Sequence, residues 1–365
     1  MDYGEVKIGL MDSNVTKLKG GPLVFMGRLK EGMIDKGVYS EDNFNKWINL
    51  SFKKIPKEVL KRREDMEIIV RFDGIYNVSL VPNRIPKSLK SIWDRAFFIY
   101  INNKIVKNYK IADKIIYQSE FSKFHIEDLL LKRFKVDLGN KKTKIIYNGI
   151  DINRFKPEEN LKNTSNFPNI LVSHRMVPYK RAHQIPQIVS KLRNYYPNLK
   201  VHVVGNGVKN PLYFNESSLD YFKKQVKALG LDENFCFYGY VEPNNLPKVY
   251  NSCDFMLNLS YADPCPNVVI EAMACGLPVI APNSGGIPEL IGTSELLVNE
   301  EIDLVKFYPM FCYEDLPKIE SDKYVEKILQ VLEKLQFYSQ YCRERAVKNF
   351  DINNIIEEYI SFACE

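Results

Sequence analysis

The sequence predicts an α/β protein made of two doubly wound domains in series. Its 365 residues are more than one ordinary hydrophobic core accommodates. Short runs rich in Val, Ile and aromatic residues alternate with longer amphipathic runs, which is the pattern of βα units on a parallel sheet. A polar segment rich in Pro and Asn, 156–168, has the composition of a linker and divides the chain into two halves.

The alternation predicts the elements in order. In the first half, we expect strands at 6–11, 47–52, 67–72, 114–118 and 144–147, with helices at 22–33 and 89–109. In the second half, we expect strands at 169–173, 200–204, 235–238, 255–259 and 278–281, with helices at 184–196, 219–229, 246–251 and 267–275. Helices at 321–335, 339–349 and 352–362 are predicted to end the chain. The first domain then covers 1–155 and the second 165–350.

Composition narrows the class of protein. Hydrophobic residues make up 45% and charged residues 26% of the chain, and no run approaches the roughly 18 uncharged apolar residues of a membrane span. The first residues, MDYGEVKIGLMDSNV, are acidic where a signal peptide has a basic start and an apolar block. Seven cysteines without a CxxC pair, none before Cys236, argue against a disulfide framework or a zinc site. We therefore expect a cytoplasmic protein.

The net charge of +6 is unevenly distributed. Residues 1–155 carry +11 and residues 156–365 carry −5. A basic first half indicates an anionic partner, such as a membrane surface, a phosphorylated acceptor or nucleic acid. A solvated lysine-rich face explains the same numbers equally well.

The most informative stretch is 260–289, SYADPCPNVVIEAMACGLPVIAPNSGGIPE. The Pro264-Cys265-Pro266-Asn267 run cannot continue a strand or a helix, and Asn267 is a good N-cap for the run that follows. A helix that begins there directs its free N–H groups at the carboxyl edge of the sheet, where doubly wound proteins bind ligands. Asp263 would lie in the loop, where its carboxylate can accept from hydroxyl groups of a ligand. Glu271, one turn into the helix, could accept hydrogen bonds from two neighbouring hydroxyls of the same ligand.

Other chemistry-bearing residues follow predicted strands of the second half. The sequence LVSHRMVPYKR supplies Arg175 and Lys180, with an adjacent Arg181 that we expect to point outward. His174 is expected to be a packing residue. Gly205 lies in a tight Gly-Asn-Gly turn after one strand, and the pair Tyr240 and Val241 follows another.

The 260–289 run resembles the donor-binding signature of the family 4 glycosyltransferases, the group 1 type with the GT-B fold, in which two acidic residues are separated by seven others. ADKIIYQSEF at 112–121 and KIIYNGIDINRF at 144–155 are similar to further patterns of that family, so that 112–290 matches well and the first hundred residues poorly. The resemblance implies two Rossmann-like domains facing across a cleft, with residues 351–365 crossing back onto the first. It places the basic pair Arg175 and Lys180 on the donor diphosphate.

The resemblance also implies the rest of a donor site. A nucleoside diphosphate sugar would be held by Glu271 and by residues at the ends of strands and the start of a helix: Gly205, Tyr240, Val241, Pro266 and Asn267. In the first domain, paired glycines Gly20 and Gly21 suit a loop that folds over a phosphate or the transferred sugar, or else form an ordinary βα turn.

The first domain departs from the family at one strand end. Many members carry a histidine there, but this chain has only His125, His174, His183 and His202, none at such a place. Asp73 stands at that strand end, in VRFDG. It could accept hydrogen bonds from the sugar or the acceptor, or it could pair with Arg71 as a structural residue.

The expected activity is metal-independent transfer of a hexosyl unit, with retention of configuration, to a glycan, lipid-linked or protein acceptor. Asp263, Arg175, Lys180 and Asp73 are the candidate catalytic residues, and no Asp-x-Asp pair of the metal-dependent transferases is present. Peripheral contact with an anionic membrane through the first domain is expected, and nucleic acid is not an expected partner. A non-catalytic donor-binding subunit and a sugar-nucleotide epimerase remain alternatives.

Overall fold

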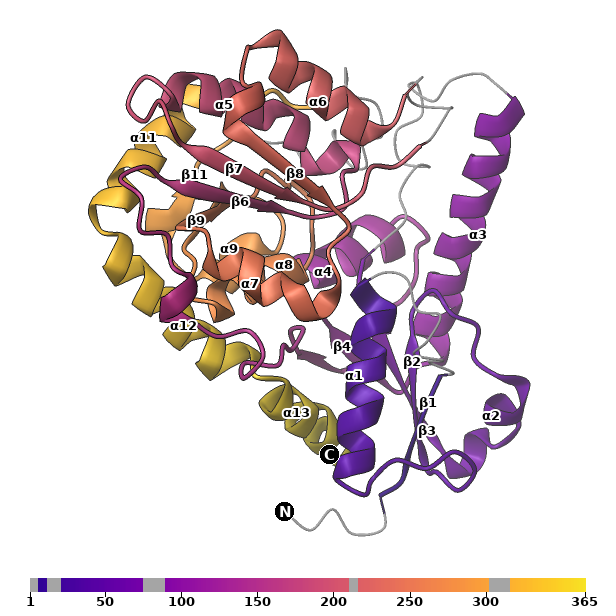
Figure 1. Cartoon of the computed structure of the whole chain (residues 1–365). Helices are drawn as coiled ribbons and strands as arrows, with labels where there is room; N and C mark the ends of the chain where they lie inside the picture. Colours follow the sequence, from indigo (N-terminus) through magenta and orange to yellow (C-terminus); the bar gives the residue numbers. More distant parts are fainter. Residues whose placement is uncertain (1–5, 12–20, 75–88, 210–215, 302–315) are drawn as a thin grey trace. The chain divides into compact units, whose positions relative to one another are not determined.

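The computed structural model describes residues 6–11, 21–74, 89–209, 216–301 and 316–365. The chain forms two compact units, one of Met1–Asp151 with Phe350–Glu365 and one of Ile152–Asn349 (Figure 1). The predicted linker, 156–168, lies inside the second unit. The side chain of Asn251 holds its backbone, because it accepts from Glu158 N at 2.8 Å and donates to Lys156 O at 2.9 Å. The Asn163 side chain adds a hydrogen bond to Asp254 at 2.7 Å.

The sheet of the first unit has five parallel strands. They are β1 (Ile8–Leu10), β2 (Lys46–Leu50), β3 (Glu67–Phe72), β4 (Lys114–Tyr117) and β5 (Lys142–Ile145), and they lie in chain order. Ile and Val occupy the middle of β3 and β4, and both strands are buried on both faces, as a parallel sheet covered by helices requires. Since these strands do not reverse their order, a doubly wound arrangement is not what the described part of this sheet shows.

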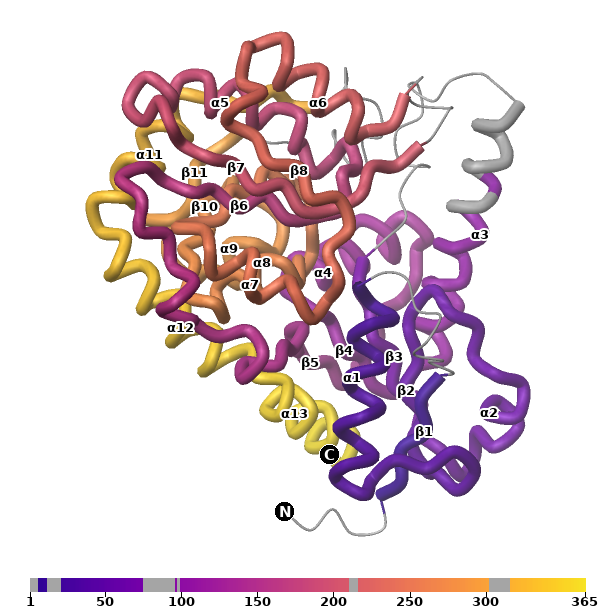
Figure 2. The backbone as a smooth tube through the Cα atoms, in the orientation of Figure 1, coloured from indigo at the N-terminus to yellow at the C-terminus, as the bar shows by residue number. Residues whose placement is uncertain are grey.

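Helices of the first unit come from both ends of the chain. They are α1 (Gly21–Asp35), α2 (Lys57–Lys61), α3 (Leu89–Ile111), α4 (Glu120–Phe124), which continues as a π-helical turn at His125–Leu131, and α13 (Ile352–Cys364). Figure 2 shows α13 beside α1, where the rings of Phe25 and Tyr359 lie 5.7 Å apart. The Asp351 side chain caps α13 by accepting from Asn353 N at 3.0 Å.

The second unit contains a six-stranded parallel sheet. Its strands are β6 (Asn169–Ser173), β7 (Lys200–Val204), β8 (Phe235–Gly239), β9 (Phe255–Leu257), β10 (Val279–Pro282) and β11 (Leu297–Val298), in the order β11-β10-β9-β6-β7-β8. The order reverses between β6 and β9, which is the topological switch point of a doubly wound sheet. This strand order places the candidate ligand site of the unit beyond the carboxyl ends of β6 and β9.

Helices cover both faces of this sheet. Figure 1 shows α5 (Ile185–Leu192) and α6 (Ser218–Ala228) on one side and α7 (Leu246–Asn251), α8 (Asn267–Ala274) and α9 (Ile287–Ile291) on the other. The chain then continues through α11 (Ser321–Glu333) and α12 (Leu335–Phe350). Short 3₁₀ turns occur at Arg63–Asp65, Glu159–Leu161, Pro178–Lys180, Ala182–Gln184, Asp232–Asn234, Pro243–Asn245 and Ser294–Leu296.

No helix within the described ranges is long and apolar enough to span a lipid bilayer.

Candidate functional site

The carboxyl end of β6 is where the predicted donor residues of the second unit meet. Two backbone hydrogen bonds join it to the end of β7, His174 N to Val204 O at 3.1 Å and Met176 N to Asn206 O at 3.0 Å. A third, Gly205 N to Gly239 O at 2.7 Å, joins the end of β7 to that of β8. Gly205 has a φ of +129°, and a Cβ there would lie 2.0 Å from the carbonyl oxygen of His174. Only glycine permits this close approach, so the predicted tight turn is required by the packing of β6 against β7.

Lys180 and Asp263 form an ion pair across the switch point. Lys180 ends the 3₁₀ turn that follows β6, and Asp263 lies in the loop that follows β9. The ammonium donates to Asp263 Oδ2, with the two side chains only 9% and 18% exposed. Burial lowers the pKa of Lys180, but the charge and hydrogen bond of Asp263, together with nearby Tyr179, outweigh this effect, so the net pKa is raised and the lysine stays cationic.

The Asp263 loop is fixed by its neighbours. Cys265 N donates to Asp263 Oδ1 at 3.3 Å, and Gly286 N donates to Asp263 O at 2.9 Å. Gly285 has a φ of +68°, and a Cβ there would lie 2.8 Å from Asp263 O. The predicted small-residue turn therefore lets its backbone press directly on the loop that holds the carboxylate.

Glu271 lies in the middle of α8 and is only 7% exposed. The hydroxyl of Tyr250 donates to Glu271 Oε2 at 3.2 Å. The helix begins differently from the prediction: Pro266, with a φ of −71°, is the N-cap residue and Asn267 is the first helical residue, so Asn267 is not the N-cap. Proline has no side-chain acceptor, and no side-chain cap hydrogen bond is made at Pro266.

The cations near β6 differ sharply in burial. Arg175 is exposed, whereas Lys180 is buried. Arg181, predicted to point outward, is fully buried: its Nε donates to Leu259 O at 2.7 Å and its guanidinium pairs with Glu300 at 2.8 Å. A positive φ of 54° at Arg181 turns the side chain inward, which the alternation of neighbouring side chains did not predict.

His174 is buried and stays neutral. Burial, together with the nearby charge of Lys180, lowers its pKa to about 3, and its Nδ1 lies 3.2 Å from Arg175 O. Tyr240 and Val241 directly follow β8, with Tyr240 62% exposed. Their position at the carboxyl edge puts their backbone on the same side of the sheet as Lys180 and Glu271.

In the first unit, Asp73 follows β3 and pairs with Arg71, Nη2 to Oδ1 at 2.7 Å. The same Arg71 nitrogen donates to Gln118 Oε1 at 3.1 Å and to Asn148 Oδ1 at 2.5 Å, and the guanidinium lies 4.1 Å from the ring centre of Phe25. Burial raises the pKa of Asp73, and the charge of Arg71 only partly offsets it. The ion pair of Asp73 with Arg71 at the carboxyl edge of the sheet is compatible with both predicted roles of Asp73.

The glycine loop of the first unit is only partly described. Gly21 is the exposed first residue of α1, and Gly20 lies outside the described residues.

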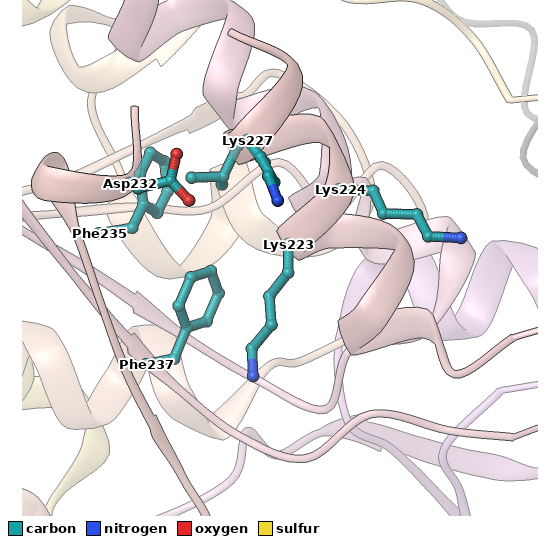
Figure 3. Close-up of a pocket in the computed structure, with 7 residues that line it drawn as sticks. Lys223, Lys224, Lys227, Asp232, Phe235 and Phe237 are labelled. Atoms are coloured by element: carbon teal, nitrogen blue, oxygen red, sulfur yellow. The ribbon is translucent and has the colours of Figure 1, made fainter. Parts of the chain in front are cut away.

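Two hollows of the described surface lie away from these residues. One, of about 290 Å³, lies between α6 and the edge strand β8, with Phe235 and Phe237 on β8 and the Lys223 ammonium 5.3 Å from the Phe237 ring (Figure 3). The other, of about 420 Å³, is lined by Lys46, Glu67 and Asp113 near the amino ends of β2, β3 and β4. Ligand sites in parallel sheets lie at the carboxyl edge, so we place the candidate site at β6 and β9.

Sequence reasoning missed two residues of this region, Ser173 and Tyr250. The Ser173 hydroxyl lies 2.7 Å from the Tyr250 hydroxyl, which in turn donates to Glu271. Ser173 was visible as the last residue of a predicted strand, but nothing in the sequence connects Tyr250 to it.

Most of the second unit matches a known protein family. Residues 152–304 match the family model described as glycosyl transferases group 1. Spore coat protein SA of Bacillus subtilis is 24% identical over 319 residues, which cover 80% of this chain and 78% of that protein.

Solved structures share the fold. Sucrose-phosphate synthase from Thermosynechococcus elongatus superposes with a TM-score of 0.69 at 15% identity and covers 98% of both chains. Anabaena HepE in complex with UDP gives a TM-score of 0.66 at 16% identity, over 98% of this chain and 99% of the other. The chain therefore has the GT-B fold of these solved structures, and its segment from β6 to β11 is similar to the group 1 glycosyltransferases.

Proposed function

We propose that the protein transfers a hexosyl unit from a nucleoside diphosphate sugar to a glycan, lipid-linked or protein acceptor, with retention of configuration and without a metal ion. The observation that carries this proposal is the Lys180–Asp263 pair at the switch point, with Glu271 on the helix that follows the Asp263 loop. The match of residues 152–304 to the group 1 family model supports glycosyl transfer, and the UDP held by the HepE structure illustrates the donor class that this fold accommodates.

Each residue has a part in the proposed reaction. Breaking a glycosyl–phosphate bond leaves negative charge on the diphosphate, and Lys180, Arg175 and the N–H groups at the start of α8 would stabilise it. Positive charge from these groups is the reason to propose that no metal is needed.

Asp263 would orient the sugar by accepting from its hydroxyls. To do so it must share its carboxylate between the sugar and Lys180, since the two are already hydrogen-bonded. A lysine drawn toward the diphosphate would release Asp263 to the sugar, which couples binding of the two parts of the donor. The departing phosphate would take the acceptor's proton in a front-face mechanism.

Glu271 would hold the ribose, while the backbone at Tyr240 and Val241 would contact the base. These groups lie at the ends of β8 and on α8, on the same carboxyl edge as the cations. Gly20 and Gly21 in the first unit are proposed to close over the donor.

The test is a donor screen followed by a turnover assay. Thermal-shift measurements across UDP-, GDP- and ADP-hexoses should identify one donor that raises the melting temperature, because a ligand bound only by the folded state stabilises it. With that donor, release of the nucleoside diphosphate should require an acceptor, and NMR should show the anomeric configuration of the donor in the product.

Other results would point to the alternatives. Donor binding without turnover on any acceptor would favour a non-catalytic subunit. Release of UDP with epimerised sugar and no acceptor would favour an epimerase.

A further inference from the structure

A buried chain of hydroxyl and carboxyl groups crosses three elements of the second unit. The Ser173 hydroxyl at the end of β6 lies 2.7 Å from the Tyr250 hydroxyl on α7. The Tyr250 hydroxyl lies 3.2 Å from Glu271 Oε2 on α8. All three residues are buried, with Tyr250 fully enclosed.

The hydrogen bonds among Ser173, Tyr250 and Glu271 all run in one donor-to-acceptor direction. A carboxylate only accepts, so the Tyr250 hydroxyl uses its single proton on Glu271 and accepts from the Ser173 hydroxyl. Burial and the adjacent charge of Glu271 raise the pKa of Tyr250 well above its usual value, which keeps the hydroxyl protonated as a donor. Hydrogen bonds that point the same way along a chain polarise and strengthen one another.

This chain restricts a side chain that is otherwise flexible. A glutamate has three rotatable side-chain bonds, and each rotamer lost on ligand binding costs affinity. Tyr250 fixes the Glu271 carboxylate before any ligand arrives. These hydrogen bonds also connect the Glu271 carboxylate to the end of β6. Ser173 lies two residues before Arg175, in the segment that leads to the cations of the candidate site.

We propose that Tyr250, supported by Ser173, is the positioning residue that aims Glu271 at the ribose of the donor and makes the site select ribonucleotides over deoxyribonucleotides. This inference rests on the proposed function, in which Glu271 accepts from the ribose hydroxyls. It narrows the donor to the class of ribonucleoside diphosphates with both ribose hydroxyls present.

The experiment measures nucleotide affinity by calorimetry on the full chain. UDP, GDP and ADP are each compared with their 2′-deoxy and 3′-deoxy forms, using wild type, Tyr250→Phe, Ser173→Ala and Glu271→Gln. Tyr338→Phe is the control, because it removes the hydroxyl of another buried tyrosine that donates to a glutamate, the exposed Glu295 at 2.9 Å, without contacting the candidate site. Far-UV circular dichroism and melting temperature establish that each variant is folded.

We expect Tyr250→Phe to weaken binding of the ribonucleotide by about three- to tenfold, the range for one hydrogen bond, and to leave the deoxy forms nearly unchanged. The ratio of the affinity for the ribonucleotide to the affinity for its deoxy forms should therefore fall. A general loosening of side-chain packing would weaken both and would not change this ratio. Ser173→Ala should lower the same ratio by a smaller factor, and it serves as the deciding variant if Tyr250→Phe does not fold. Tyr338→Phe should keep the wild-type ratio.

Two different failures can be told apart. If Glu271→Gln loses the discrimination while Tyr250→Phe and Ser173→Ala keep it, the positioning role is overturned and the proposed function stands. If the wild type binds none of the nucleotides, the proposed function and this inference are both overturned.

Discussion

The ammonium of Lys180 hydrogen-bonds the carboxylate of Asp263 from the opposite side of the point where the strand order of the second sheet reverses. Each of the two residues lies in a loop that leaves the carboxyl end of a central strand, β6 for Lys180 and β9 for Asp263. The pair thus brings the cation and the acid of the proposed chemistry together without a ligand. In the proposed reaction, the donor would have to displace this contact.

Lys180→Ala should lower kcat by about a hundredfold to a thousandfold, the usual effect of removing one group that stabilises developing charge. The measurement is steady-state kinetics with the donor identified by the screen. Lys191→Ala is the control, since Lys191 also pairs with an aspartate, Asp322 at 2.7 Å, but both side chains are largely exposed. Equal losses in the two variants would contradict a role for Lys180 in the reaction.

The proposed absence of a metal has its own test. Activity of the wild type should be unchanged by a chelator, and added Mg²⁺ or Mn²⁺ should not rescue Lys180→Ala. Full inhibition by the chelator, reversed by a divalent ion, would show that a metal rather than Lys180 and Arg175 neutralises the diphosphate.

Glu271→Ala should weaken nucleotide binding by about 1.5–3 kcal/mol, the scale of a hydrogen bond to a charged group. The fold should survive because the Tyr250 hydroxyl retains its partner Ser173. Glu295→Ala, which deletes a carboxylate that also accepts from a tyrosine, is the matched control and should bind nucleotide normally. Unchanged affinity in Glu271→Ala would remove this residue from the donor site.

The sequence could predict that the candidate donor residues lie at one edge of the second sheet, because their information is local. Asp263, Glu271 and the turn that contains Gly285 lie within one run of about thirty residues, and the parallel-sheet rule brings Lys180 to the same edge. The burial of Arg181 could not be predicted in this way, because its partner Glu300 follows β11, on the far edge of the sheet. Likewise, 156–168 has the composition of a linker, but its contacts with Asn251 depend on tertiary packing.

The order of the first sheet illustrates the same limit. Hydrophobic runs predicted its five strands to within a few residues, but β1 to β5 lie in chain order. Strand periodicity fixes which segments are extended and not which neighbours they pair with. A two-residue strand such as β11 is too short for periodicity to reveal at all.

Asp73→Asn separates the two roles of Asp73. If the carboxylate positions the sugar or the acceptor, turnover should fall tenfold or more, roughly 1.4 kcal/mol, while donor affinity and melting temperature stay near wild type. If the Arg71 pair is structural, the melting temperature should fall and turnover per folded molecule should be near normal. Arg71 keeps Gln118 and Asn148 as partners in the variant. We therefore expect the variant to fold, so that its turnover can be measured.

The basic first unit should bind anionic membranes if its acceptor is lipid-linked. Lys54, Lys57 and Lys61 are exposed, whereas Arg62 donates to Phe44 O at 2.6 Å and Arg63 pairs with Asp113 at 2.5 Å. Co-sedimentation with vesicles should therefore rise with anionic lipid, fall with salt, and weaken when the three exposed lysines are changed to glutamine. Indifference to lipid charge and to salt would instead indicate a solvated lysine-rich face and a soluble acceptor.

Stability of the first unit should fall in mild acid because of His125. The ring is buried 3.9 Å from the ring centre of Phe121, and burial lowers the pKa of His125 to about 3 from an ordinary value near 6.5. Between these two values the unfolded chain binds a proton that the folded chain does not, so the free energy of unfolding decreases as the pH falls. For one such histidine the loss in the free energy of unfolding between pH 7 and pH 5 is about 2 kcal/mol.

His125→Gln removes this titration, so the shift of the urea midpoint between pH 7 and pH 5 should shrink. The other buried histidines, His174 and His183, keep their own contributions. An unchanged shift in His125→Gln would mean that His125 is protonated at the same pH in the folded and unfolded chain.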